Sequence, residues 1–437
     1  MKIRKLQLTG YKVFDELELD FTDLEGNTLD TVVLAGVNGS GKTSILDLFY
    51  KMLHIPYHSS LSNYQTEPYY EVQKISECSD ITLTMELEPL LVEQVKTRLH
   101  QDYEYLIQLL HSSLRLIDGR VRPSGSRNAI DQLERLIYRL EGCTNNITLE
   151  LKRDCNDLTV FLQRLAFIKK IGYFGTNFIQ KKSGEVVTNI NDYIVNSVTE
   201  RVLKVRDITS GQVIAETVNK INNMFIGMDV KTKLVDIMTS PIFESFNGKR
   251  ISTDQISEGE QQLFYRAVYL QRLDLNDSII LIDEPETSLH PTWQRNILKL
   301  YQNIGKNNQI IVATHSPHVI ASVKPESLFV LYPNAETAKI EPINMAKAHK
   351  HTKGVEPNRI LQEIMGIEDL RDPETRQRID EIAELLRLHP EQVDLPENEA
   401  KIEKLRNDLG KGDPFIIRMN HQLLLIKRRN LSHEIHS

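Results

Sequence analysis

The chain has 437 residues and a formal charge of −7, from 53 Lys and Arg against 60 Asp and Glu, with 40% hydrophobic and 26% charged residues. This composition supports roughly two to three globular units and excludes a disordered, collagen-like or disulfide-stapled chain. The sequence contains no apolar run of the about 18 residues that a membrane span needs, no secretion signal and no metal-type cysteine spacing, so we expect a cytoplasmic protein. The mild acidity argues against general coating of nucleic acid but allows a local basic groove.

The N-terminal segment predicts a hairpin, a strand and a helix in that order. Residues 3–8 and 16–21 alternate apolar and polar side chains, which is typical of an antiparallel pair. Residues 31–35 form a short apolar run, as expected of a strand buried on both faces. A glycine-rich turn follows, and the apolar spacing over 44–53 then predicts a helix.

The middle of the chain predicts strands around an inserted helical arm. Residues 81–87 and 147–151 have the pattern of strands, whereas about 89–142 has a helical pattern. This pattern is broken by Gly119 and by Pro123-Ser-Gly-Ser126, which suggests two helices joined by a loop. The mixed stretch that follows gives no clear assignment.

Two further apolar runs, 278–283 and 309–313, flank a helical pattern over 293–304. Strand, helix and strand at this spacing predict a parallel sheet with right-handed crossovers. We therefore expect an α/β fold whose mixed β-sheet core, antiparallel β subdomain and inserted arm together occupy residues 1–350.

Residues 351–437 are expected to form a separate, all-helical module. Asp372-Pro373 and Asp413-Pro414 each place proline in the first turn after an aspartate cap, which is a strong helix start. Gly410 ends the helix between them.

A phosphate-binding loop is the strongest motif. Gly36-Val-Asn-Gly-Ser-Gly-Lys-Thr43 fits G-x-x-x-x-G-K-[ST] at every position, between a predicted strand and a predicted helix. Glycines let successive N–H groups point at one anion, and the helix start adds its positive dipole end. Lys42 is expected to reach the β- and γ-phosphates of ATP, and the Thr43 hydroxyl to bind Mg²⁺. The predicted nucleotide-binding residues here are Gly36, Asn38, Gly39, Ser40, Gly41, Lys42, Thr43 and Ser44.

An acidic pair, Asp283-Glu284, closes the apolar run at 279–282. An aspartate at the end of a buried strand can lie beside the phosphate loop and hold Mg²⁺, and the adjacent carboxylate can act as general base on the attacking water. By itself such a pair is as readily a solvated acidic turn. Behind a phosphate-binding loop the catalytic interpretation is favoured.

Three further motifs resemble those of ABC-type ATPase heads, especially the SMC and RecF-like group. Ser257-Glu-Gly-Glu-Gln-Gln262 resembles the signature motif, Glu286-Thr-Ser-Leu-His-Pro291 resembles the D-loop, and Ala313-Thr-His315-Ser resembles the segment of the switch histidine. All the motifs occur in the order of such a head. One departure is Glu258, at a position where transporter signatures usually carry glycine.

This resemblance implies a dimer. In such heads the signature motif faces the nucleotide of the other subunit, so Ser257, Gly259 and Glu260 are expected to contact ATP bound by a second copy. His315 is expected near the γ-phosphate, which makes it a catalytic residue together with Glu284 and Lys42. The structural alternatives are a simple helix cap for Ser257 and a satisfied buried histidine for His315.

Weaker predictions concern the hairpin turn. Lys12 with its neighbours Tyr11 and Phe14 lies where related heads contact the base or the α-phosphate, although an exposed turn explains these residues equally well. Gln65 is one possibility for the glutamine that links such a core to its helical arm.

Two features of the tail have plain structural explanations. His349 and His351 lack the further ligands of a metal site, so a solvated loop is favoured. Lys427-Arg-Arg429 is expected to be a basic helix end on a solvated surface, with nucleic acid or an acidic partner as the alternative.

Features that the chain lacks narrow the choice among members of this family. About 210 residues separate Thr43 from Ser257, which is too few for the long rod of an SMC protein. No Toprim-type Glu and Asp-x-Asp follow His315, so no intrinsic nuclease is predicted. The tail, from Pro357 to Gly366 and again from Glu399 to Asp413-Pro414, is similar to the C-terminal helices of PtuA proteins, the ATPases of Septu and some retron antiphage systems.

These resemblances imply an ATPase of an antiphage defence complex that controls a PtuB-like HNH nuclease, with a retron reverse transcriptase and its nucleic acid as possible partners. The alternative is a RecF/SMC-like repair ATPase that binds DNA directly. A third hypothesis is an ATP-binding scaffold with little or no hydrolysis.

Overall fold

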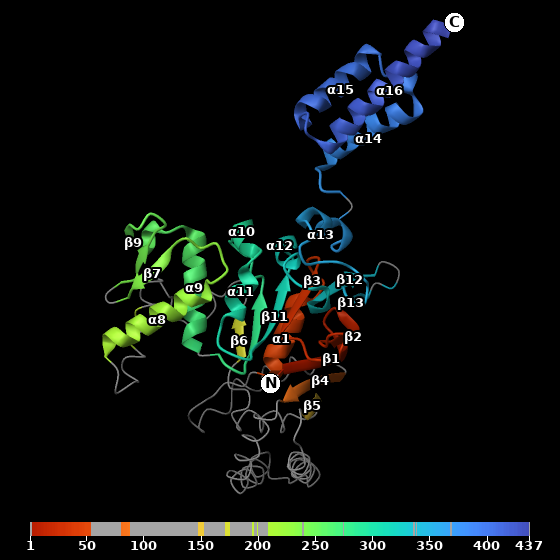
Figure 1. Cartoon of the computed structure of the whole chain (residues 1–437). Coiled ribbons are helices and arrows are strands. Elements are labelled where there is room, and N and C mark those ends of the chain that lie inside the picture. Colours follow the sequence, from red (N-terminus) through yellow and green to blue (C-terminus); the bar gives the residue numbers. More distant parts are fainter. Residues whose placement is uncertain are drawn as a thin grey trace. The chain divides into compact units, whose positions relative to one another are not determined.

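The computed structural model describes residues 2–53, 80–87, 147–152, 171–174 and 209–436, apart from 238–239, 274, 335–336, 338 and 368, together with the single positions 195 and 199. The chain divides into two compact units, Met1–Ile360 and Leu361–Ser437 (Figure 1). Throughout these described ranges, no helix combines the length and the apolar character needed to cross a membrane. The predicted arm at about 89–142 and Gln65 lie outside the described residues.

The N-terminal strands form a four-stranded antiparallel sheet in the order β2-β1-β4-β5. The predicted hairpin is confirmed, with Leu6 paired to Leu19 on one side and to Leu83 on the other. Because side chains alternate between the faces of a sheet, this register places the leucines on one buried face. The strands are β1 (Lys2–Tyr11), β2 (Phe14–Asp20), β4 (Asp80–Leu87) and β5 (Ile147–Lys152).

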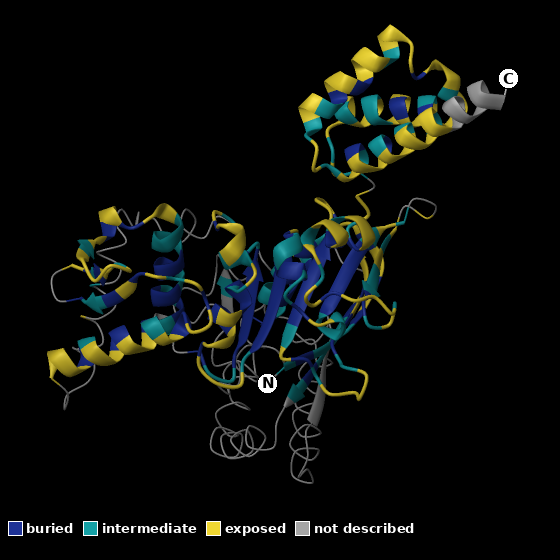
Figure 2. Cartoon of the chain, turned by 45° about the horizontal axis from the view of Figure 1, so that its top comes forward, coloured by how far each residue is buried: buried dark blue, intermediate teal, exposed yellow. Residues whose placement is uncertain are grey.

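A six-stranded sheet in the order β13-β12-β3-β11-β10-β6 forms the centre of the first unit. Its strands are parallel except for β13, which pairs antiparallel with β12. Every residue of β10 and β11 is buried, as the dark strands of Figure 2 show, so the apolar runs are explained by cover on both faces. The strands are β3 (Thr31–Gly36), β6 (Ile171–Phe174), β10 (Ile279–Asp283), β11 (Gln309–Thr314), β12 (Leu328–Pro333) and β13 (Ile340–Asn344).

One apolar cluster joins both sheets through helix α1 (Lys42–Leu53). The helix buries Ile45, Leu48 and Phe49 completely, against residues that include the inward side chains of β1 and β3. Phe49 meets Phe21 edge-on at 6.0 Å between ring centroids. Each fully buried side chain of this size contributes about 1.5–3 kcal/mol. The start of α1, and with it the phosphate-binding loop, is therefore anchored by the main core.

A second group of elements precedes and includes the signature motif. It comprises helix α8, a three-stranded antiparallel sheet in the order β7-β8-β9, a 3₁₀ turn and helix α9. Phe264 of α9 packs on Phe225 and Phe243, each 4.8 Å away between ring centroids. The bounds are α8 (Ser210–Met224), β7 (Lys233–Asp236), β8 (Ile242–Glu244), β9 (Arg250–Ser252), η1 (Thr253–Gln255) and α9 (Glu258–Leu273).

The single helix predicted over 293–304 is wrong, because the structure contains two short helices there, α10 (Pro291–Gln294) and α11 (Ile297–Gln302). The break falls at Asn296, whose backbone has a φ of −116° and whose N–H donates to the carbonyl of Trp293, three residues back, at 3.0 Å. Among the residues that the structure describes, further short helices are α12 (Pro317–Ile320) and η2 (Pro325–Ser327), and α13 (Pro357–Glu363) spans the end of the first unit.

The first unit continues past residue 350, where the sequence suggested its end, to Ile360. Hydrogen bonds attach the intervening loop to the rest of the first unit: the Thr352 hydroxyl donates to the Val323 carbonyl at 2.6 Å, and the Gly354 N–H to that of Ala321 at 2.9 Å. Ile360 is fully buried.

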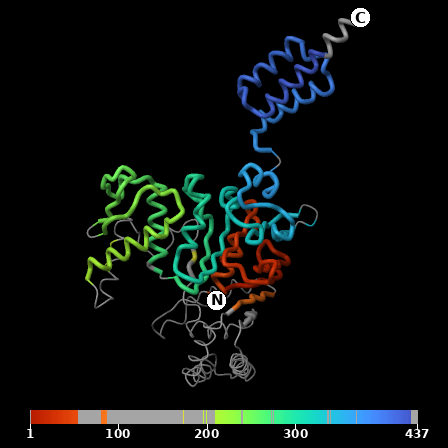
Figure 3. The backbone as a smooth tube through the Cα atoms, in the orientation of Figure 1, coloured from red at the N-terminus to blue at the C-terminus, as the bar shows by residue number. Residues whose placement is uncertain are grey.

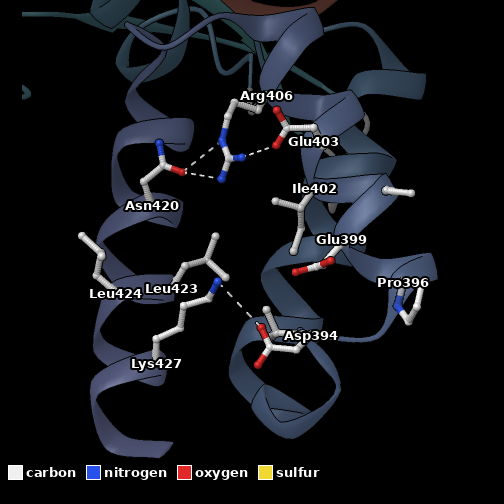
Figure 4. Close-up of a pocket in the computed structure, with 12 residues that line it drawn as sticks. Asp394, Pro396, Glu399, Ile402, Glu403, Arg406, Asn420, Leu423, Leu424 and Lys427 are labelled. Atoms are coloured by element: carbon white, nitrogen blue, oxygen red, sulfur yellow. Dashed lines mark hydrogen bonds and ion pairs between the residues drawn. The ribbon is translucent and has the colours of Figure 1, made fainter. Parts of the chain in front are cut away.

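The second unit is a bundle of three helices, as the caps predicted: α14 (Pro373–Leu388), α15 (Pro396–Leu409) and α16 (Pro414–His436), with the 3₁₀ turn η3 (Pro390–Gln392). Asp372 accepts a hydrogen bond from the Thr375 N–H at 2.9 Å, and Gly410 ends α15 with a φ of 79°. Its core includes Ile402 and Leu405. A cavity of about 690 Å³ opens between α15 and α16, where Lys427 reaches Asp394 (Figure 4).

Candidate nucleotide-binding and hydrolytic site

Three predicted motifs meet at one edge of the central sheet. Because β3, β11 and β10 are parallel neighbours, their carboxyl ends share this edge, with Ala35 opposite Thr314 and Ala313 opposite Asp283. The phosphate-binding loop leaves β3 here, the acidic pair leaves β10, and the histidine segment leaves β11. Figure 3 shows how these strands come together from distant parts of the chain.

The loop at 36–43 needs glycine at specific points. Gly41 has a φ of 88°, and a Cβ there would lie 2.3 Å from Cζ of Phe14. Gly39 has a φ of 83° and faces open space within 4 Å. The first glycine lets the hairpin pack against the loop, and the second leaves a concave backbone surface exposed. Asn38 is exposed there, and Ser44 lies in the first turn of α1.

Lys42 turns its ammonium group back over the loop. Nζ donates to the carbonyls of Gly36 and Val37 at 2.9 and 3.0 Å, and the residue is only 7% exposed. Burial lowers the pKa of Lys42, while the carboxylates of Glu284, Asp283 and Glu286 oppose this effect. A cation held inside a loop of N–H groups is suited to a polyphosphate.

The Ser40 hydroxyl is another polar group of the cradle. Ser40 is 1% exposed, and its Oγ has no hydrogen-bond partner within the part of the chain that the structure describes. A buried hydroxyl without a partner lowers stability unless a ligand satisfies it. The loop therefore fits a bound phosphate chain.

Thr43 and Asp283 bring two oxygen ligands together from α1 and β10. The threonine hydroxyl lies 2.9 and 3.2 Å from the two carboxylate oxygens. Burial raises the pKa of Asp283 to about 6; the Thr43 hydrogen bond opposes the shift, and the Glu284 carboxylate adds to it. Hydroxyl and carboxylate oxygens are the donors that hard divalent cations prefer, so this pair fits such an ion.

Glu284 and His315 form the next pair at this edge. Glu284 has a left-handed φ of 50°, and its N–H donates to the Ala313 carbonyl at 2.8 Å. Its Oε1 lies 3.2 Å from Nδ1 of His315, whose side chain is 46% exposed. The histidine is therefore not a satisfied core residue, and it lies within reach of both a carboxylate and solvent.

The signature motif begins helix α9 with reciprocal capping bonds. The Ser257 hydroxyl accepts from the Glu260 N–H at 3.3 Å and donates to the Glu260 carboxylate, which also accepts from the Ser257 N–H. The other Glu260 oxygen accepts from the Thr232 hydroxyl at 2.5 Å. Glu260 therefore has structural partners in its own chain, while Ser257 is exposed at the positive end of the helix.

Contacts that the sequence did not reveal join this motif to the loop after β10. A Cβ on Gly259 would lie 2.8 Å from Cζ3 of Trp293, whose Nε1 donates to the Asp229 carbonyl at 3.0 Å. Arg266 of α9 donates to the carbonyls of Pro285 and Thr287. Glu286, predicted only as the first D-loop residue, accepts three hydrogen bonds from the histidine segment. A lone tryptophan and an Asp-Glu-Pro-Glu run were the only hints in the sequence.

The hairpin turn combines buried and exposed residues. Tyr11 and Phe14 are buried, whereas Lys12 is exposed with a φ of 51°. Its Nζ lies 3.6 Å from Asp47 and 5.4 Å from the centre of the Tyr11 ring. Nucleotide contact by Lys12 stays a prediction.

The tail histidines have the character expected of a loop. His349 and His351 are both exposed. Across the residues that the structure describes, no group of three or more His, Cys, Asp or Glu side chains is arranged to hold a metal ion.

Comparison with known families decides the class of this site. The family model for the AAA ATPase domain matches residues 1–320. This chain belongs to the AAA ATPase domain family. The expected membership among P-loop ATPases is confirmed, and the protein is an ATPase that binds a nucleotide.

Relatives of this AAA ATPase carry retron and Septu names. It is 26% identical over 390 residues to the "Retron Vc95 probable ATPase" of Vibrio cholerae, covering 76% of this chain and 73% of that protein. It is 32% identical over 97 residues to the "Septu protein PtuA" of Bacillus thuringiensis, covering 22% of this chain and 24% of that protein. The expected similarity to PtuA and retron ATPases is confirmed. A crystal structure of the "SmcHead bound to the C-winged helix domain of ScpA" aligns with a TM-score of 0.43 and 14% identity, over 80% of this chain and all of that one.

Proposed function

We propose that this AAA ATPase hydrolyses ATP with Mg²⁺ in a cytoplasmic antiphage defence complex. The single observation that carries the hydrolytic part is the meeting of Lys42, the Thr43–Asp283 pair and the Glu284–His315 pair at one edge of the sheet. The names of the retron and Septu relatives support the defence part.

Each side chain at the edge has one role in this proposal. Lys42 moves from its loop carbonyls to the β- and γ-phosphates, and the backbone N–H groups of residues 36–44 hold the phosphate oxygens. The Thr43 hydroxyl and the Asp283 carboxylate would hold Mg²⁺, which would supply positive charge to offset that of the phosphates. Glu284 orients and deprotonates the attacking water, and His315 contacts the γ-phosphate.

The second part of the proposal is a homodimer closed by ATP. The exposed Ser257 and the N–H group of Gly259 lie at the start of a 16-residue helix, where an anion is favoured, and Glu260, whose N–H is bonded to the Ser257 hydroxyl, follows them. In the dimer these groups bind the γ-phosphate held by the other copy. ATP then favours closed over open pairs by its difference in affinity for the two states.

The third part is control of a partner nuclease. In this proposal the helical segments, including residues 361–437, carry a PtuB-like HNH nuclease whose access to substrate depends on the nucleotide state. A retron reverse transcriptase with its nucleic acid is the further partner that the Vibrio relative suggests.

Replacing the proposed base tests the first two parts. In Glu284→Gln the amide cannot take a proton from water, so bound ATP should persist and the dimer population should rise in size-exclusion chromatography with light scattering. Glu16→Gln, an exposed carboxylate on β2, is the matched control and should behave as wild type. A Glu284→Gln variant that neither retains ATP nor dimerises more strongly would show that the base is assigned wrongly.

Two further experiments separate the dimer and the partner. Adding Ser257→Arg to Glu284→Gln should abolish the ATP-dependent dimer while leaving ATP bound to the monomer, because the phosphate-binding loop is intact. Affinity purification of the full chain with the product of the adjacent gene should recover a nuclease. Recovery of no nuclease would remove the third part of the proposal without affecting the first two.

A further inference from the structure

Glu286 is a buried acid whose role the proposed reaction does not yet include. It lies two residues after Glu284 and is only 6% exposed. Carboxylates are seldom buried to this degree unless strong partners compensate for the lost hydration. Its surroundings should therefore show what it stabilises.

One oxygen of Glu286 organises the whole turn after β11. Its Oε1 accepts from the Thr314 hydroxyl at 2.6 Å and from the backbone N–H groups of His315 and Ser316 at 3.0 Å each. Three donors that converge on one charged acceptor make hydrogen bonds about twice as strong as neutral ones. All three come from consecutive residues, so the carboxylate determines the backbone path that carries the imidazole.

The other oxygen of Glu286 makes burial of this carboxylate unfavourable for stability. Oε2 is buried and has no hydrogen-bond partner among the residues that the structure describes. An unsatisfied buried oxygen lowers stability. The favourable contribution of this side chain therefore comes from Oε1 and the turn that it holds.

The held turn places His315 against the proposed base. Nδ1 of His315 lies 3.2 Å from Oε1 of Glu284 and 3.9 Å from Oε1 of Glu286. On its other side, Ser316 caps α12 through the N–H groups of His318 and Val319 and donates to Gln294 at 2.7 Å. The backbone of the turn is thus fixed at both ends, and this sets the point from which the half-exposed imidazole of His315 extends toward Glu284.

We propose that Glu286 is the positioning residue of His315: through three hydrogen bonds to residues 314–316, it holds the imidazole where it meets Glu284 and the reacting phosphate. This inference rests on the proposed function, because it takes Glu284 as the base and His315 as the γ-phosphate contact. Glu286 itself touches neither nucleotide nor water in this scheme.

The test compares steady-state ATP hydrolysis by six variants with their thermal unfolding. Glu286→Ala should lower kcat by about 10- to 100-fold, the range expected for a misplaced catalytic group. The KM for ATP should change by less than about threefold, since the phosphate-binding loop is untouched. Glu286→Gln keeps an oxygen acceptor for the same three donors, so its kcat should exceed that of Glu286→Ala by about tenfold.

The chain offers a matched control on β11, the strand that leads into the turn held by Glu286. Gln309, at the opposite end of β11, is fully buried and also makes three side-chain hydrogen bonds, with the backbone of Ile3 and Leu29. Gln309→Ala should lower thermal stability as much as Glu286→Ala while leaving the kcat of the folded enzyme unchanged. Equal effects of the two alanine variants on kcat would overturn the proposal.

A double variant tests whether Glu286 acts through His315. If it does, Glu286→Ala combined with His315→Ala should be no slower than His315→Ala alone. A double variant that is slower by the product of both effects would assign Glu286 a separate role and overturn the inference. Glu284→Gln in the same assay distinguishes failure of the proposed hydrolytic site from failure of the positioning role of Glu286. Undiminished turnover in Glu284→Gln would refute the proposed hydrolytic site, whereas an inactive Glu284→Gln beside a fully active Glu286→Ala would refute the positioning role alone.

Discussion

Arg266 connects helix α9 to the loop that carries Glu284, the proposed general base, and its removal should loosen both. The guanidinium makes a short hydrogen bond to the Pro285 carbonyl and longer ones to the Thr287 carbonyl, at 3.3 Å, and the Tyr301 hydroxyl, at 3.4 Å. Hydrogen bonds from a charged group contribute about 1.5–3 kcal/mol each when well formed, and long ones contribute little. Arg266→Ala should therefore lower the free energy of unfolding by about 2–3 kcal/mol.

The chain contains its own probe for this experiment. Trp293 is its single tryptophan, and it packs against Gly259 beside the braced loop. Its fluorescence in urea reports the unfolding of the first unit, independently of the unfolding of residues 361–437. A fall in ATP turnover should accompany the loss of stability, because Glu284 lies in the loosened loop.

Two control variants define the result that would refute this reasoning. Lys339→Ala removes an exposed ion pair with Asp15, 3.8 Å apart, and should cost less than about 0.5 kcal/mol. Arg266→Lys keeps the charge but not the planar fork, so it should lie between wild type and Arg266→Ala. If Arg266→Ala unfolds at the same urea concentration as Lys339→Ala, the hydrogen bonds of Arg266 contribute nothing to stability.

Three further predictions concern the metal pair, the phosphate-binding loop and the helical module. Because the folded-state pKa of Asp283 is raised to about 6, the metal-free carboxylate takes up a proton below that pH, and the apparent Mg²⁺ affinity should fall as the pH drops from 7.5 to 5. Equal affinities in titration calorimetry at the two pH values would contradict this. Gly41→Ala should abolish nucleotide binding in equilibrium dialysis, since its Cβ would lie 2.3 Å from a packed aromatic ring. Gly39→Ala, with a similar φ but open space around it, should lower stability by only about 1 kcal/mol. Similar nucleotide binding by both variants would refute the steric argument. Asp413 caps α16 and pairs with Arg371 at 2.9 Å, so Asp413→Ala should destabilise the helical module by about 2 kcal/mol. Amide hydrogen exchange should become faster within residues 361–436 only, and unchanged exchange would refute the prediction.

Local patterns predicted the elements whose formation depends on neighbouring residues. The apolar runs of β3, β10 and β11, the glycine spacing of the loop at 36–43 and the aspartate-proline starts of α14 and α16 are all contiguous features. They specify burial, backbone conformation or capping without reference to the rest of the chain. The structure confirms each of them.

Elements without a local pattern were missed or misplaced. Strand β6 has only four residues, and it is a strand because Ile171 pairs with Ile279 of β10. Strands β8 and β9 have three residues each and exist through mutual pairing. The continuation of the first unit to Ile360 depends on hydrogen bonds to Ala321 and Val323, which no spacing in residues 345–355 announces.

The sequence by itself determined which chemical groups this ATPase has available: a glycine loop with one lysine, a hydroxyl, an acidic pair, a histidine and a serine at a helix start. Only the tertiary structure decided which of them meet. Thr43 and Asp283 are 240 positions apart and yet within hydrogen-bond distance, and Glu286 holds the turn of His315 from a different strand connection. Such contacts arise because parallel strands from distant segments end at one edge of a sheet, and this arrangement is set by the packing of the whole core and by no single stretch of residues.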